Sequence, residues 1–258
     1  MPTNDAAMTL GLAYQVAQPD VTLAFLVESF WLLTTTAETD HPILLLPDGR
    51  IDVLFSYSRT QPFHVSLMGL STVAEQTILA AGTVIGAVSL RLPAAEYLLQ
   101  TRMADLLNGM RLLASDFWGI APTDLTDFEQ FCAKLTATLR GLLPPAIDLR
   151  KQRLFVQIYA SDGALPVHTL AAQSGWSSRQ INRYFQEYFG LSLKAYCAML
   201  RFRAAFPQLK AGRLFPDQHF ADQAHFIREV RKFAGVRPSE LARNRDGRFI
   251  QFSAWPAP

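Results

Sequence analysis

The chain has 258 residues, half of them apolar, so it is long enough for two domains with cores and too apolar to be disordered. Its net charge of +2 hides an asymmetry, because residues 1–150 carry a balance of −7 and residues 151–258 a balance of +9. An acidic half joined to a basic half is typical of a sensor joined to a DNA-binding domain. The two cysteines, Cys132 and Cys197, lie far apart without metal-ligand spacing, which excludes a disulfide or zinc framework.

The first part of the chain is rich in β-branched, aromatic and aliphatic runs, separated by Gly, Pro, Asp and Ser. So many short strands favour a small barrel or jelly roll. The segment Pro47-Asp48-Gly49-Arg50 predicts the tight reversal of a hairpin. The predicted strands are Leu10–Val16, Thr22–Leu33, Ile43–Leu46, Ile51–Tyr57, His64–Gly69 and Gln76–Leu90.

Few groups in this part suggest chemistry. His41 and His64 have no His-x-His or Glu partner nearby, so we expect no metal site. Glu28 interrupts an apolar strand, and the sequence leaves open whether it faces solvent or a ligand pocket. The aromatic strand residues fit either a pocket lining or plain core, and no ligand-binding residue is assigned. These aromatic residues are Trp31, Phe55 and Tyr57.

Helices are predicted after the strands. Pro93 suits a helix start before Ala94–Gln100, and a second apolar segment follows at Met103–Leu113. A longer amphipathic helix is predicted over 126–143, where Pro144-Pro145 ends it. Its apolar face fits packing on the barrel or pairing with a second copy, so a homodimer stays open.

Residues 165–190 predict two helices joined by a tight turn at Gly175, since such a turn needs a positive φ. Ser177 and Gln180 have the Ser-x-x-Gln spacing of a capping box at the start of the second helix. One face of that helix carries side chains that match guanine and adenine edges in the major groove. The candidate DNA-binding residues here are Arg179, Gln180, Asn182, Arg183 and Gln186.

This stretch resembles the first helix-turn-helix unit of the AraC/XylS family of bacterial transcription regulators. The segment from Gly190 to Ala205 resembles the family's linker helix, and residues 220–238 resemble the second recognition helix with its closing Gly-x-x-Pro. The resemblance covers about residues 151–243. It extends to the first half through Glu28-Ser29-Phe30-Trp31 and Leu46-Pro47-Asp48-Gly49, which are similar to the sensory domain of an AraC-type subset.

The resemblance implies an α+β protein of two domains. A β-barrel or jelly-roll-like domain with flanking helices precedes an all-α domain, in which a linker helix joins two helix-turn-helix units. We expect a sensory or oligomerisation domain at 1–143, a linker at 144–152, a DNA-binding domain at 153–243 and a tail at 244–258.

The second unit departs from the family's pattern. Pro216 interrupts its supporting helix, His219 stands where Gly would make the turn, and Pro207 should end or kink the linker helix. We therefore expect this unit to contribute mainly positioning and affinity through phosphate contacts. Its candidate DNA-binding residues are Gln223, Arg228, Arg231 and Lys232.

The expected function is sequence-specific DNA binding by a one-component transcription regulator. The implied partners are double-stranded DNA, a small-molecule effector, a second copy of the chain and, for an activator, RNA polymerase. A regulator without a ligand is the alternative within this class. A cytoplasmic location without membrane contact is expected, because the N-terminus lacks a signal pattern and the apolar stretch Leu23–Leu33 is short and broken by Glu28.

An enzyme is the other class. DNA-repair methyltransferases can carry an AraC-like module, but they need an activated cysteine. Cys132 and Cys197 both fall on apolar helical positions, so neither an enzyme nor a cofactor is expected.

Overall fold

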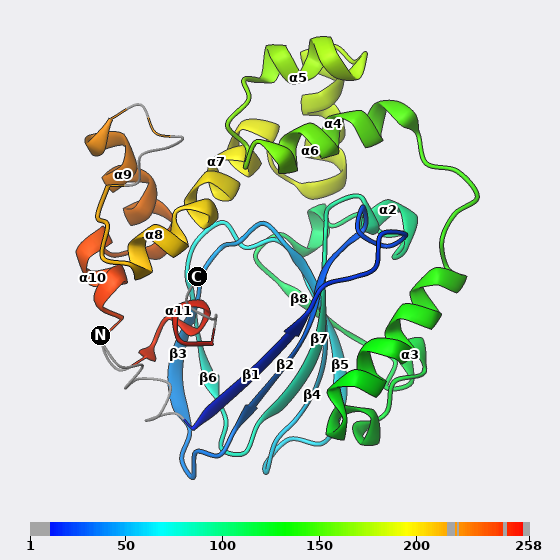
Figure 1. The fold of residues 1–258 in the computed structure, drawn as a ribbon, viewed down its shortest axis with the longest axis vertical. Helices are drawn as coiled ribbons and strands as arrows, with labels where there is room; N and C mark the ends of the chain where they lie inside the picture. Colours follow the sequence, from blue (N-terminus) through cyan, green and yellow to red (C-terminus); the bar gives the residue numbers. More distant parts are fainter. Residues whose placement is uncertain (1–10, 216–219, 221, 245–246, 255–258) are drawn as a thin grey trace.

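The computed structural model describes residues 11–215, 220, 222–244 and 247–254. A strand-rich domain lies on one side of the molecule and the helices of the second half lie along its upper and left edges in Figure 1. Within the described residues, the strands form an antiparallel six-stranded sheet, β1-β2-β7-β4-β5-β8, and a separate pair, β3-β6. The strands are β1 (Leu12–Ala17), β2 (Val27–Thr35), β3 (His41–Leu45), β4 (Ile51–Tyr57), β5 (His64–Met68), β6 (Glu75–Leu79), β7 (Val84–Leu90) and β8 (Met110–Leu113).

The two faces of the large sheet differ because successive strand residues point to opposite sides. In β4, Val53 and Phe55 are fully buried, and the Phe55 ring lies 6.0 Å from that of Phe131 on the covering helix α3. The alternate residues of β4 instead line a cavity between the two sheets. Gly86 lets α3 approach closely, because a Cβ there would clash with Leu125 and Phe131. The arrangement confirms the predicted strand-rich first domain. It also places the face of the large sheet that carries both polar and apolar side chains inside this domain, toward the cavity.

Several predicted strand limits were wrong. Residues 21–26 form a turn, and the Asp20 side chain before it accepts from the backbone N–H of Thr22 at 2.8 Å, so β2 starts at Val27. The predicted strand Gln76–Leu90 is two strands, separated by a turn at Gly82 with φ +63°. The apolar segment Met103–Leu113 contains the edge strand β8, which pairs with β5. β8 has only four residues, of which Met110, Arg111 and Leu112 are exposed, so no alternation marked it as a half-buried strand and it was missed.

The predicted hairpin at Pro47–Arg50 was also wrong. β3 pairs with β6, whereas β4 pairs with β5 and β7, so the segment crosses between two sheets. Gly49 has the positive φ of +78° that the Asp-Gly pair indicates, but it serves this crossing instead of a two-residue reversal.

The helical second half follows α3, and α7 runs diagonally between its two units (Figure 1). α7 ends at Ala204 and Pro207 lies in the first turn of α8, as the sequence predicts. Residues 149–152 of the proposed linker form the first turn of α4. Pro216 and His219 lie outside the described residues. The helices are α2 (Ala94–Tyr97), η1 (Ala104–Leu106), η2 (Phe117–Gly119), η3 (Pro122–Thr126), α3 (Phe128–Gly141), α4 (Leu149–Ala160), α5 (Val167–Ser174), α6 (Ser178–Phe189), α7 (Leu193–Ala204), α8 (Phe206–Lys210), α9 (Gln223–Ala234), α10 (Pro238–Arg243) and α11 (Ile250–Ala254).

The hydrophobic cores do not stop at the domain boundary. Phe155 and Phe185 of the first helical unit belong to the same buried cluster as Met103 of the first domain. A second cluster joins the second unit to Leu46 of the first domain and to Phe252 of the tail. The two halves are therefore packed as one body.

Candidate nucleic-acid interface and cavity

The turn between α5 and α6 has the geometry that the sequence predicts. Gly175 ends α5 with φ +74°. Gln180 donates its backbone N–H to Ser177 Oγ at 3.2 Å, and Ser177 donates its backbone N–H to Gln180 Oε1 at 2.9 Å. This reciprocal capping box satisfies two N–H groups that would otherwise have no helical partner.

The inner face of α6 fixes the helix on its neighbours. Ile181, Phe185 and Phe189 are fully buried. The Phe185 ring lies 5.8 Å from Phe155 of α4 and 5.3 Å from Phe189, so aromatic packing continues along the helix. Met103 donates its backbone N–H to the Tyr188 carbonyl at 2.7 Å, which ties the end of α6 to the first domain.

The outer face of α6 carries the predicted contact residues. Arg179 and Arg183 are exposed, and Arg183 approaches Glu187 at 4.0 Å with 72% of its side chain accessible. The amide side chains bond to their own helix: Asn182 donates to the Ser178 carbonyl at 3.0 Å and Gln186 to the Gly190 carbonyl at 3.2 Å. The arginines are therefore the groups that extend furthest toward a ligand, while Gln180 is held in the cap.

The second unit presents a comparable helix. Asp222 caps α9 by accepting the His225 backbone N–H at 2.7 Å. Phe233 is buried and stacks on Phe202 of α7, with 5.2 Å between ring centroids. The four predicted contact residues of this helix are all exposed on its outer side: Gln223, Arg228, Arg231 and Lys232.

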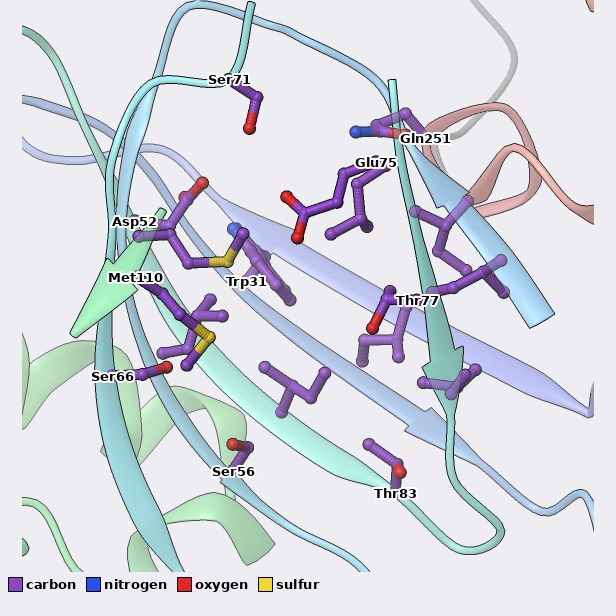
Figure 2. Close-up of a pocket in the computed structure, with 18 of the residues that line it drawn as sticks. Trp31, Asp52, Ser56, Ser66, Ser71, Glu75, Thr77, Thr83, Met110 and Gln251 are labelled. Carbon is purple, nitrogen blue, oxygen red and sulfur yellow. The ribbon is translucent and has the colours of Figure 1, made fainter. Parts of the chain in front are cut away.

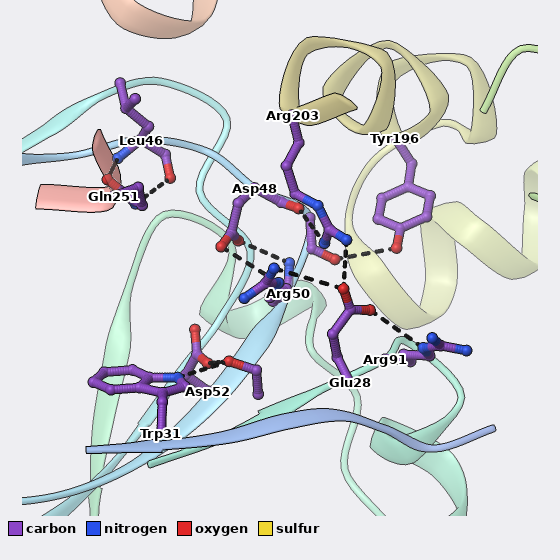
Figure 3. Close-up of polar contacts among 12 residues, drawn as sticks. Glu28, Trp31, Leu46, Asp48, Arg50, Asp52, Arg91, Tyr196, Arg203 and Gln251 are labelled. Atoms are coloured by element: carbon purple, nitrogen blue, oxygen red, sulfur yellow. Dashed lines mark hydrogen bonds and ion pairs between the residues drawn. The ribbon is translucent and has the colours of Figure 1, made fainter. Parts of the chain in front are cut away.

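Glu28 lies at the contact between the two halves and not in the cavity or in open solvent. Its carboxylate accepts a hydrogen bond from Arg203 of α7, and it lies 3.2 Å from Arg91 Nε and 3.6 Å from Arg50 Nη2 (Figure 3). Burial opposes the charged form, but these three guanidinium groups outweigh it and lower the pKa of Glu28 to about 2. We call these four residues the Glu28 cluster.

The crossing segment 47–50 docks on α7 beside this cluster. The Tyr196 hydroxyl donates to the Gly49 carbonyl at 3.1 Å, and Arg203 Nη1 donates to the Asp48 carbonyl at 3.2 Å. The Glu28 to Arg203 contact spans 175 residues of sequence. The sequence shows Glu28 as an acidic residue inside an apolar strand, but no residue near it in the sequence indicates that Arg203 is its partner.

A cavity of about 320 Å³ lies between the two sheets (Figure 2). Trp31 and Tyr57 line it, whereas Phe55 belongs to the core on the other face of the sheet. The Trp31 indole N–H donates to Ser89 Oγ at 2.9 Å, and the Ser89 hydroxyl donates to Asp52. Burial, followed by the nearby charge of Asp48, raises the pKa of Asp52 to about 7.

One wall of this cavity comes from the far end of the chain. Ile250 and Gln251 of α11 line it. The Gln251 side chain bonds to both the backbone N–H and the carbonyl of Leu46, at 3.1 and 3.0 Å. The ring centroid of the next residue, Phe252, lies 5.0 Å from that of Phe206 in the core of the second unit. The tail therefore contacts the cavity and the helical domain together, which no local pattern of residues predicts.

The thiols show no activation. Burial raises the pKa of Cys132 and that of Cys197 to about 11 each, so neither forms a thiolate near neutral pH. Among the described residues no cluster of His, Cys, Asp and Glu is grouped as metal ligands would be. Across the same residues no helix has the length and apolar character needed to cross a bilayer.

Comparisons with known proteins agree with these features. Residues 170–244 match a family described as a helix-turn-helix domain, and residues 15–110 match a domain of unknown function, DUF6597. No curated protein matches the chain.

Similar solved structures include ToxT from Vibrio cholerae. In a P21 crystal form, ToxT is 11% identical, with a TM-score of 0.42 over 91% of this chain and 98% of that chain. ToxT from strain O395 is 10% identical, with a TM-score of 0.43 over 90% and 97%. ToxT bound to an unsaturated fatty acid is 12% identical, with a TM-score of 0.39 over 90% and 94%.

The matched helix-turn-helix segment holds the capped helix α6, the linker helix α7 and the second helix α9. With this segment behind a strand-rich DUF6597 domain, the chain is a DNA-binding transcription regulator with a helix-turn-helix domain in its second half.

Proposed function

We propose that this regulator is a one-component switch, in which α6 contacts bases, α9 contacts mainly phosphates and the cavity of the first domain holds a small effector. The observation that carries the proposal is the outer face of α6, where Arg179 and Arg183 stand exposed on a helix whose inner face is fully buried. A side chain must be presented by a rigid element to discriminate bases.

The cavity supports an effector because it has a volume typical of the lower end of small-molecule sites. The tail supplies a route for the response, because it lines the cavity with Gln251 and packs on the second unit with Phe252. Resemblance to the family extends the proposal to two more partners, a second copy of the chain and, for an activator, RNA polymerase. It also supports a cytoplasmic location. A regulator without a ligand is the competing proposal, since such a cavity could also serve assembly alone.

The DNA contacts are tested on the full-length protein, with a duplex site that it selects from a random pool. Arg183→Ala should cost about 1–3 kcal/mol on the selected site and much less on random duplex, because a bidentate arginine contact discriminates bases. Arg59→Ala is the matched control, since this exposed arginine sits in the β4–β5 turn and pairs with Glu38. Equal losses on both duplexes would make Arg183 a phosphate contact.

A further inference from the structure

The charged side chains that line the cavity in the described part of the chain are of two kinds. Arg50 lies 3.6 Å from Asp48 and 3.6 Å from Glu28, and its side chain is 7% exposed. His64 has both ring nitrogens engaged, with the Pro62 carbonyl at 2.9 Å and Ser56 Oγ at 3.0 Å. The basic groups of the wall are thus already occupied by the protein itself.

Asp52 and Glu75 are different. Asp52 projects from β4 of the large sheet and Glu75 from β6 of the small one, and both point into the same space near Trp31 (Figure 2). Among the described residues, the hydrogen bonds of the Asp52 network come from neutral donors, Ser89 and, through it, Trp31, and the charge of Arg50 lowers the pKa of Asp52 without offsetting its burial. Two carboxylates on opposite walls therefore face one space beside an indole ring.

The rest of the lining is largely apolar. Its aliphatic and thioether side chains include Leu33, Ile43, Met68, Leu79, Ile85 and Met110. A ligand that fills about 320 Å³ would bury an apolar body against these groups and leave its polar end toward the carboxylates.

Resting on the proposed function, we propose that the effector of this cavity is a small organic cation, an ammonium group on an apolar body. The ammonium lies between Asp52 and Glu75 and against the face of Trp31. Carboxylates supply charge-assisted hydrogen bonds, and an indole face attracts a cation through its quadrupole. An anionic ligand would instead meet two carboxylates, while the arginine and histidine of the wall are already bonded.

The protonation of Asp52 supports this assignment. Its pKa is raised to about 7 by burial and by the charge of Asp48, so the protein's own groups do not fully compensate its ionised form. A bound cation would supply that compensation. Binding should therefore release a proton near neutral pH and weaken as the pH falls.

The test uses two probes with similar apolar bodies, 2-phenylethylammonium and 3-phenylpropionate, on the full-length protein. Binding is followed by titration of the Trp31 indole N–H resonance, assigned by its loss in Trp31→Phe. We expect the ammonium to bind at least about tenfold more tightly than the carboxylate, equivalent to ~1.4 kcal/mol. Glu75→Gln should remove most of that preference. Glu129→Gln, which neutralises an exposed acid on α3, should leave it unchanged.

Equal or tighter binding of the carboxylate would overturn the cation assignment, and so would an unmoved Trp31 resonance with both probes. If Glu75→Gln lowers the melting temperature, the same loss of preference for the ammonium is tested with Asp52→Asn, which removes the other carboxylate. DNA binding on the selected site is measured with the same preparations. If it stays sensitive to Arg183→Ala while neither probe binds, the cation inference fails and DNA recognition stands.

Discussion

Glu28 shows how one residue can hold two domains together through charge. Its carboxylate lies among the guanidinium groups of Arg50, Arg91 and Arg203, which come from three separate parts of the chain. Removing one charged residue from such a buried cluster leaves the remaining charges without compensation. The resulting loss of stability is larger than the net contribution of the intact ion pairs.

Glu28→Gln should therefore lower the free energy of unfolding by on the order of 3 kcal/mol at pH 7, since one pKa unit corresponds to ~1.4 kcal/mol. The folded pKa of about 2 lies below the ordinary 4.5, so the stabilisation is present above pH 4.5 and is lost as the pH falls toward 2. Urea unfolding across this range measures the difference between wild type and variant. A difference that stayed constant with pH would show that the ionised carboxylate is not its source.

The ionisation of Asp52 has the opposite effect on stability to that of Glu28. Its folded pKa of about 7 lies above the ordinary 3.8, so the unfolded chain ionises first and stability falls as the pH rises across that window. Asp52→Asn keeps an oxygen to accept from Ser89 but removes the buried charge. The variant should melt higher than wild type at pH 8, by about 2–4 °C per ~1 kcal/mol gained, and equally at pH 4. Calorimetry at both pH values checks this, and a lower melting temperature at pH 8 would contradict it.

At the scale of elements, α9 differs from α6 in the side chains it offers. α6 presents Arg179 and Arg183 from its first half, whereas α9 carries Arg231 and Lys232 in its last turn. The N-terminal residues of a recognition helix are the ones that contact base edges, so cations in its last turn are placed for phosphate contacts.

Arg231→Ala combined with Lys232→Ala should weaken binding to the selected site and to random duplex alike. The log–log salt slope should fall by up to about 0.9 for each phosphate that the double variant no longer neutralises. Anisotropy titrations over a range of salt concentrations measure both effects. A loss confined to the selected site would instead make α9 a base-contacting helix.

The elements differ in how far sequence could predict them. The turn at Gly175, the Ser177 to Gln180 capping box and the end of α7 before Pro207 follow from local chemistry, and all were predicted. β8 and the crossing at 47–50 depend on which strands pair, and pairing is decided by distant residues.

The cavity shows the same limit. Its apolar and aromatic residues could be read as possible pocket or core, but the wall made by Gln251 joins positions 205 residues apart. No periodicity in the sequence records such a contact. The candidate DNA-contacting residues of α6 could be predicted because that helix is capped and amphipathic in its own right.

At the scale of the whole molecule, we propose the domain limits 1–143 and 153–243, with DNA binding confined to the second. A fragment of residues 144–258 should bind duplex DNA and a fragment of residues 1–143 should not. The C-terminal fragment should also melt at a lower temperature than the full chain, because it loses the carboxylate partner of Arg203 and the apolar partner Met103. Anisotropy and calorimetry measure the two properties separately. DNA binding by the N-terminal fragment would overturn the assignment.

The Glu28 cluster limits how freely the two domains can be recombined with those of other regulators. A gene fusion that joined this sensory domain to the DNA-binding domain of another regulator would inherit Glu28 without a guaranteed arginine at the place of Arg203. The acid would then be buried beside fewer cations, and the hybrid would begin with a weakened boundary. A stable hybrid of these two domains therefore needs matched residues on both sides of the boundary, an acid at position 28 and a cation at the place of Arg203.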